Sequence, residues 1–424
     1  VKEIQIINFL KCRKINVPQY IKTKSNEFYI KYENEIIILQ KFIDGYTIEN
    51  NTVDHDKVIE SATILGRIIK ELQKYKKLDD ENIIEKWFSK ESLENKIIQM
   101  EDFKKSIKND NKYKEVFLKD LEDKIEIAKK LKEQFDFSII SKMSIMNSHG
   151  DYSVQQLIYN NEKETSVIDF ESAKRLPIMW EIIRSYTYID KDVKNGEMNI
   201  DTFVEYVNEI SKYVELNEFD LKYCAYIYLI QIVGSLYGYK QYNENYEQTE
   251  LLNFAIFRTN LCGYLYEHLD EIGTRLEKEV TEYMQKEKLD VLNERGEFTG
   301  RIETREECHR KGLWHRCVYA FVIDKNSNIL LQKRSANKKL WPNLWVTVGG
   351  HVDSGEFGRQ ALIRECKEEL GIDICDKDIK YLVGSCSKTT KGKITNNQFN
   401  ECYLITKDID ISKVKLQEEE VAEI

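Results

Sequence analysis

Three glutamates near the C-terminus, Glu365, Glu368 and Glu369, are spaced so that a helix over residues 357–370 would carry them on one face. Side chains three and four residues apart are neighbours on a helix surface, so these carboxylates would repel one another if nothing compensated them. An ordinary helix does not need acid groups at this spacing. A chemical role for the carboxylates is one interpretation, and a solvated acidic face with Arg364 as partial compensation is the other.

The residues around the three glutamates favour the chemical role. A glycine pair lies upstream, Glu356 precedes the helix, and Gly371 stands where a helix would end on a left-handed residue. The complete pattern comprises Gly350, Glu356, Arg364, Glu365, Glu368, Glu369 and Gly371. At every fixed position this pattern resembles the Nudix box, and residues 286–424 are therefore expected to form a Nudix hydrolase domain.

The resemblance implies that Glu365, Glu368 and Glu369 hold Mg²⁺ or Mn²⁺, with the Gly349 carbonyl as a further ligand. Such ions neutralise a diphosphate and lower the pKa of bound water, so the implied reaction is cleavage of a nucleoside diphosphate linked to another moiety, or of a similar small phosphorylated substrate. For the general base, Glu368 and Glu420 are both candidates.

Two alternatives remain open in this domain. Glu356 either pairs with Arg364 to brace the loop or acts as a metal ligand. The stretch also resembles the isopentenyl-diphosphate isomerase-like branch of the Nudix superfamily. Isomerases carry a cysteine ahead of a Gly-His pair, where this chain has Gly349 before Gly350 and His351. Hydrolysis is therefore expected, with isomerisation as the alternative.

A second pair of acids lies in the middle of the chain. Residues 146–186 predict a loop, a strand over 156–159, a turn at Asn160-Asn161, a strand over 166–170 and a helix beginning near Trp180. This hairpin would bring together Asp151 and Asp169. In the alternative interpretation Asp151 only caps a turn and Asp169 only ends a strand.

This segment resembles the catalytic core of aminoglycoside phosphotransferases and choline kinase-like enzymes. The residues that carry the resemblance are His149, Gly150, Asp151, Gln156, Ile168, Asp169 and Phe170. It implies that Asp151 orients or deprotonates the acceptor hydroxyl, while Asp169 and Gln156 hold magnesium on the phosphates of ATP or GTP. Two departures, Gln156 in place of the family's asparagine and no phosphate-binding lysine before Glu3, motivate the alternative of a catalytically inactive ligand-binding module.

The length of 424 residues predicts more than one domain. We expect an α+β protein with a protein kinase-like domain over residues 1–285, consisting of an incomplete N-lobe (1–46) and a C-lobe (47–285), followed by a Nudix α/β/α sandwich over 286–424. A charged helix ending near residue 288 is expected to join them. Because the sequence starts without methionine and stops at Ile424, both ends are expected to be truncated.

The composition limits the kinds of partner. A net charge of −9 and a pI near 5.5 provide no basic surface for nucleic acid polymers and disfavour an anionic membrane surface. The nine cysteines form no C-x-x-C pair, which indicates reduced thiols and a cytoplasmic protein. Cys308, His309 and His315 match no zinc pattern and are expected to be structural. No sequence signal indicates an oligomeric state.

Overall fold

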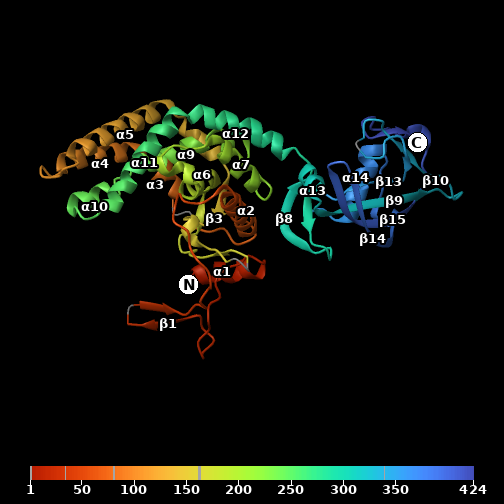
Figure 1. The fold of residues 1–424 in the computed structure, drawn as a ribbon, viewed down its shortest axis with the longest axis horizontal. Helices are drawn as coiled ribbons and strands as arrows, with labels where there is room; N and C mark the ends of the chain where they lie inside the picture. Colours follow the sequence, from red (N-terminus) through yellow and green to blue (C-terminus); the bar gives the residue numbers. More distant parts are fainter. Residues whose placement is uncertain (1, 34, 80–81, 161–163, 339) are drawn as a thin grey trace. The chain divides into compact units, whose positions relative to one another are not determined.

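The computed structural model describes residues 2–33, 35–79, 82–160, 164–338 and 340–424. The chain forms two compact units, the first ending at Met284 and the second beginning at Gln285 (Figure 1). Asn161 of the expected turn lies outside the described residues. No described helix is long and apolar enough to cross a membrane.

The first unit begins with helix α1 (Lys2–Cys12), which buries four aliphatic side chains. Strands β1 (Tyr29–Tyr32) and β2 (Glu35–Ile38) then form an antiparallel hairpin that projects away from the helices of this unit (Figure 1). Several apolar side chains of the hairpin, including Ile30 and Ile36, are half exposed. The strands therefore add little to the core of the unit.

Helices make up most of the first unit. They are α2 (His55–Leu72), α3 (Ile83–Phe88), α4 (Lys90–Ser106), α5 (Lys114–Gln134), α6 (Ile178–Ile189), α7 (Ile200–Ser211), α8 (Glu218–Lys222), α9 (Cys224–Ile232), α10 (Tyr239–Glu244), α11 (Thr249–Glu267) and α12 (Leu269–Met284). Nearly all residues of α6 are buried, whereas most of the others bury one apolar face. A helix buried on all sides belongs to the centre of a domain, and α6 contacts α7, α8 and α9 as well as strands β3 and β6.

Four short strands hold the loops that carry Asp151 and Asp169. β3 (Ile145–Ser148) pairs with β6 (Lys174–Pro177), and β4 (Leu157–Ile158) pairs with β5 (Ser166–Val167), both antiparallel. The predicted strands 156–159 and 166–170 are too long. Gln156 ends a 3₁₀ turn, and Asp169 has φ +65°, a left-handed conformation that cannot continue a strand.

The second unit is built on a seven-stranded sheet. Its strands are β7 (Lys288–Leu292), β8 (Phe298–Thr304), β9 (Trp314–Ile323), β10 (Ile329–Leu330), β13 (Val348–His351), β14 (Ile379–Lys391) and β15 (Ile394–Thr406). β15 runs parallel to the central β9, and the other pairs are antiparallel. A smaller sheet has the order β12 (Trp345–Val346), β11 (Gln332–Arg334), β16 (Val421–Glu423).

The two helices of this unit pack on opposite faces of β9. Successive side chains of a strand point to opposite faces. Val318, Ala320 and Val322 belong to the core that includes α14 (Gly358–Leu370), while His315, of the other parity, contacts His309 on α13 (Arg305–Lys311). This arrangement is the α/β/α sandwich expected from the sequence.

One expectation about the start of the second unit is wrong. The charged helix does not reach residue 288, because α12 ends at Met284 and Lys288 begins strand β7. Farther along, the extended residues 329–334 are divided between β10 and β11, which belong to different sheets, and Leu331 lies between them. Sequence periodicity does not reveal a strand that changes sheets.

Two helical glycines of the first unit provide a matched test of packing. A Cβ at Gly273 on α12 would lie 2.3 Å from the Lys222 carbonyl oxygen, whereas a Cβ at Gly263 on α11 would meet nothing within 4 Å. Gly273→Ala should therefore lower the free energy of unfolding by about 1–3 kcal/mol through overpacking. Gly263→Ala should raise it by about 1 kcal/mol through helix propensity. Thermal and urea unfolding measure both, and equal effects would contradict this packing.

Candidate active sites

Helix α14 presents the three glutamates of the box. The helix begins after Phe357, whose backbone N–H donates to the Gln360 side chain at 2.9 Å, and it ends at Gly371 with φ +66°. The predicted helix and its left-handed end are both confirmed. Glu365 and Glu369 lie on the side of α14 that faces the sheet, whereas Glu368 is half exposed.

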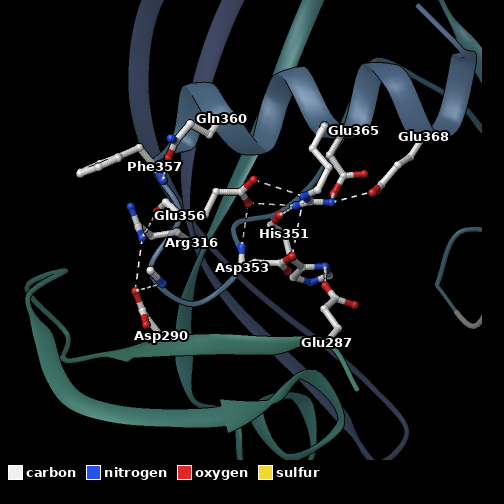
Figure 2. A network of polar contacts seen from close by, with 12 residues as sticks. Glu287, Asp290, Arg316, His351, Asp353, Glu356, Phe357, Gln360, Glu365 and Glu368 are labelled. Atoms are coloured by element: carbon white, nitrogen blue, oxygen red, sulfur yellow. Dashed lines mark hydrogen bonds and ion pairs between the residues drawn. The ribbon is translucent and has the colours of Figure 1, made fainter. Parts of the chain in front are cut away.

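The guanidinium of Arg364 pairs with three acids, Glu356, Glu365 and Glu368, which are labelled in Figure 2. Its Nη1 donates to Glu365 and to Glu368, each at 3.0 Å. Its Nε and Nη2 donate to both oxygens of Glu356 at 3.3 and 3.1 Å, and Nη2 also donates to the His351 carbonyl at 2.9 Å. Glu356 and Arg364 thus form a bidentate pair, one of the two arrangements weighed from the sequence.

The loop before α14 is tied to β7 and β9. Arg316 donates to the Glu356 carbonyl at 2.8 Å and pairs with Asp290 at 3.4 Å, and Ser354 donates to Asp290 at 2.7 Å (Figure 2). These contacts fix the loop that carries Glu356, so Arg364 meets a rigid partner.

Two glycines of β13 let the strand pass close to its neighbours. A Cβ at Gly350 would lie 2.1 Å from the Glu365 Oε1 atom, and one at Gly349 would lie 2.2 Å from the Val318 carbonyl oxygen. Only glycine at position 350 leaves room for the Glu365 carboxylate above the backbone. The sequence gives no hint of which side chain occupies that space.

Glu369 has different partners from the other two glutamates. Its side chain is buried, and Oε2 accepts from the Gln332 amide of β11 at 2.7 Å. The carboxylate of Glu420 acts on Glu369 electrostatically and pairs with the Lys338 ammonium. Glu420 therefore belongs to the surroundings of Glu369, although it is 51 residues away in the sequence.

The three box glutamates do not converge on one point in the described part of the chain, where no three carboxylates lie within 4.8 Å of one another. Arg364 binds two of them and Gln332 the third. Burial, with the neighbouring Glu369, raises the pKa of Glu365 to about 8, and burial raises that of Glu369 to about 7. Buried oxygen ligands short of positive charge fit a hard divalent cation.

In the first unit, the loop carrying Asp151 is fixed by Glu181 of α6. This fully buried carboxylate accepts hydrogen bonds from the Gly150 N–H at 2.6 Å, from the Tyr152 N–H at 3.0 Å and from the Ser148 hydroxyl. Gly150 has φ +81°, and a Cβ there would lie 2.1 Å from the Ser172 carbonyl oxygen. Glu181 could not be identified from the sequence, since a lone acid in an apolar helix signals no partner.

His149 links the loop of Asp151 to that of Asp169. Its buried Nε2 lies 3.0 Å from the Ile168 carbonyl oxygen, and burial lowers its pKa, although Asp151 and Asp169 both act on it in the opposite sense. Both aspartates thus act electrostatically on one imidazole. Asp151 also pairs with the Arg184 guanidinium of α6.

Gln156 is engaged within its own turn. Its side-chain oxygen accepts from the Ser153 hydroxyl, and its backbone carbonyl accepts from the Ile168 N–H at 3.0 Å. The Phe170 N–H, next to Asp169, donates to Glu3 of α1 at 3.1 Å. The structure therefore ties Gln156 to Ser153, and its amide oxygen would have to leave that hydroxyl to reach a metal ion.

Comparison with known proteins gives different matches for the two units. A family model described as NUDIX domain matches residues 313–424. Nudix hydrolase 3 of Arabidopsis thaliana is 37% identical over 149 residues, covering 33% of this chain and 19% of that protein. An uncharacterised Nudix hydrolase of Listeria innocua is 35% identical over 142 residues, covering 32% of this chain and 78% of that protein. The chain belongs to the Nudix family.

The first unit lies outside the Nudix match. A solved aminoglycoside phosphotransferase from Alicyclobacillus acidocaldarius is similar to 64% of this chain and 83% of its own length. The sequence identity is 14% and the TM-score 0.47.

The Nudix unit also contains three histidines that face one another. His309 of α13, His315 of β9 and His351 of β13 offer nitrogen atoms that all lie within 4.8 Å, and their ring centres are 5.3–5.4 Å apart. The Nδ1 atom of His351 lies 3.2 Å from a Glu287 oxygen, and that of His315 lies 3.0 Å from the Leu313 carbonyl oxygen. Such contacts orient imidazoles.

The histidine group could hold a metal ion that accepts nitrogen ligands. The buried Nε2 atoms of His315 and His351 have no hydrogen-bond partner among the described residues. Burial lowers the pKa of His315 to about 3, so its imidazole is neutral. His309 and His315 were expected to be structural because nothing in the spacing connects them to His351, which only the β9–β13 pairing brings close. Cys308 instead packs in a small apolar core with Leu289.

The raised pKa of Glu365 predicts how the free energy of unfolding depends on pH. Its folded-state pKa lies above its ordinary value, so the protonated form is favoured by folding. The resulting stability is full below the unfolded-state pKa and is lost as the pH rises to about 8. With EDTA present, the free energy of unfolding should fall between pH 5 and pH 8, by up to about 1.4 kcal/mol per pH unit for this one group. Urea titrations measure the slope, which should be shallower in Glu365→Gln; equal slopes would contradict the burial of this carboxyl.

Proposed function

We propose that the Nudix unit hydrolyses a diphosphate linkage in a small phosphorylated substrate, such as a nucleoside diphosphate linked to another moiety. The observation that carries this proposal is a pair of carboxylates on the side of α14 that faces the sheet, the partly buried Glu365 beside Gly350 and the buried Glu369. Together with Glu368 and the Gly349 carbonyl, they would hold Mg²⁺ or Mn²⁺. A bound ion would neutralise the diphosphate and lower the pKa of the attacking water.

Other residues of the site would brace the loop and act as the general base. Arg364 keeps Glu356 in a bidentate pair, so Glu356 braces the loop and leaves ligation to the other glutamates. Glu368 is half exposed and can turn toward solvent to accept a proton from water. Glu420 is the second candidate base, and it would have to be released from Lys338 first.

Hydrolysis is favoured over isomerisation by the residue at position 349. Gly349 has no side chain with which to give or take a proton at carbon. The nearest thiol across the β9–β13 pairing is Cys317, which is buried, accepts a hydrogen bond from Gln398 at 2.9 Å and has its pKa raised by burial. Such a thiol is inert as an acid or base.

For the first unit we infer a small-molecule phosphotransferase. Asp151 would orient the acceptor hydroxyl, and Asp169, with Gln156 once released from Ser153, would hold magnesium on ATP or GTP. The left-handed conformation of Asp169 supports this role, because non-glycine residues in that conformation cluster at functional sites. The alternative, an inactive binding module, is favoured by the Gln156–Ser153 contact.

We also propose that the protein acts on small molecules in the cytoplasm. All nine cysteines are free thiols, which suits a reducing compartment. The net charge of −9 disfavours binding to nucleic acid polymers.

Replacing one box glutamate tests the hydrolase. Glu368→Gln should lower Mg²⁺-dependent release of AMP from ADP-ribose, or of a monophosphate from another active diphosphate substrate, by about 100-fold or more, because an amide is a poorer ligand and no base. Glu294→Gln, at an exposed turn of the same unit, should leave the rate unchanged. Undiminished hydrolysis in Glu368→Gln would reject the metal site.

Replacing Asp151 tests the phosphotransferase. With the natural full-length protein and a panel of hydroxylated acceptors, ATP consumption should fall by about 100-fold or more in Asp151→Asn, since the acceptor hydroxyl loses its base. Asp102→Asn, on the exposed side of α4, is the control for the same change of charge. Absence of both turnover and ATP binding in the unmodified protein would favour the binding module.

A further inference from the structure

The face of α6 next to Asp151 carries a stripe of one cation between two aromatic rings. Trp180, Arg184 and Tyr188 follow one another at intervals of four residues, so they lie on the same side of the helix. The Arg184 guanidinium carbon lies 5.6 Å from the Trp180 ring centre and 4.9 Å from that of Tyr188, while one nitrogen binds Asp151. Arg184 therefore balances the charge of Asp151, and a cationic acceptor would gain no net attraction there.

A second arginine, Arg258 of α11, has little compensation for its charge. Its only hydrogen bond among the described residues goes to the Ser235 hydroxyl at 3.3 Å, and its shielded Nε donates to nothing. No carboxylate of the described chain forms an ion pair with it, and its guanidinium carbon lies 5.5 Å from the Phe254 ring centre. A partly desolvated guanidinium without a counter-charge favours binding of an anion.

More positive charge lies behind Arg258. The buried Lys124 of α5 donates to the Ser235 carbonyl, so both cations contact one residue. The carboxylate of Asp120 acts on Lys124 less than Cys262 and Arg258 do, and it already accepts a hydrogen bond from Tyr239. The surroundings of Ser235 are thus more positive than negative.

Aromatic side chains join the two arginines into one surface. Tyr188 stacks on Phe254 at 6.1 Å between ring centres and lies 6.4 Å from Phe257. Both guanidinium groups act electrostatically on Tyr228, whose hydroxyl lies 3.1 Å from that of Thr187 on α6. Arg184 and Arg258 therefore flank the same group of rings.

We propose that four partly exposed side chains, Arg184, Phe254, Phe257 and Arg258, form the acceptor subsite of the first unit beside the buried rings of Trp180 and Tyr188. It would bind a small molecule that combines a hydroxyl with a carboxylate or phosphate and with an apolar or flat part. The hydroxyl would face Asp151, the anion would pair with Arg258, and the apolar part would lie on the rings of Phe254 and Phe257. Polycationic aminoglycosides and amino alcohols do not suit two arginines. This inference rests on the proposed phosphotransferase, and it selects among that enzyme's acceptors.

Calorimetric titration of the natural full-length protein tests the subsite without requiring turnover. The probes are 3-phenyllactate, its uncharged counterpart 3-phenylpropane-1,2-diol, glycerol 3-phosphate, choline and kanamycin. At least one of the two anionic probes should bind about tenfold or more tightly than the diol and both cations. Comparing 3-phenyllactate with glycerol 3-phosphate distinguishes a carboxylate from a phosphate.

Variants show whether Arg258 is responsible. Arg258→Gln should weaken binding of the preferred anion by about tenfold or more, while Arg258→Lys should retain part of the affinity because it keeps the charge. Arg13→Gln, which makes the same change of charge in the turn after α1, should bind as the unmodified protein does. Thermal unfolding of each variant shows whether it is folded, and if Arg258→Gln is not, Arg258→Lys carries the comparison.

Two results would overturn the subsite: tighter binding of choline or kanamycin than of either anion, or an anion affinity that is absent or unaffected by a folded Arg258 variant. Arg258-dependent anion binding without any Asp151-dependent phosphoryl transfer would instead reject the phosphotransferase and leave the subsite standing. The two failures are therefore distinguishable.

Discussion

The Nudix site depends on how one guanidinium shares its donors among four acceptors. Arg364 binds Glu356 through both oxygens, holds Glu365 and Glu368 at 3.0 Å, and also reaches the His351 carbonyl of β13. One side chain therefore connects the loop of Glu356, helix α14 and strand β13. Without this cation, Glu365 and Glu368 would meet at close range in a partly desolvated place, where repulsion between like charges is strongest. The same contacts direct Glu365 and Glu368 to Arg364, whereas Glu369 accepts from Gln332.

In the first unit a buried negative charge, the carboxylate of Glu181, fixes the loop that carries Asp151, as the Arg364 cation fixes the loop before α14. Glu181 accepts from two backbone N–H groups and one hydroxyl of the loop between β3 and Asp151. A carboxylate with three donors is stable when buried, because charge-assisted hydrogen bonds replace its hydration. Its place on α6, the most buried helix of the unit, makes the loop as rigid as the core. Asp151 can then remain partly exposed while its backbone is fixed.

The sequence predicts those features of both sites that depend on local spacing. The helix over residues 357–370 and its end at Gly371 follow from residues that act within a few positions, whereas the layered second unit was expected from the resemblance to the Nudix box. Features that require distant segments to meet were missed: Glu181 with Gly150, His351 with His309 and His315, and Arg184 with Asp151. Each of these contacts joins an ordinary-looking residue to a partner on another element, and only the pairing of strands or the packing of α6 reveals it. Asp169 was wrongly expected within a strand because its left-handed backbone is imposed by the loop, and an aspartate tolerates that conformation without any sequence signal.

The two units differ in the charge that is left uncompensated around their acids. On α14, burial raises the pKa of Glu365 and Glu369 despite their contacts with Arg364 and Gln332. Under the proposed function, a divalent cation would complete that site. Around Asp151 the acid is already paired with Arg184, and Arg258 lacks an anion. Completion there requires negative charge from the ligand itself. A hydroxylated anion would supply that negative charge at Arg258 and leave the Asp151–Arg184 pair intact. A cation would gain attraction to Asp151 only by breaking that pair. It would then replace one charge-assisted hydrogen bond with another of similar strength.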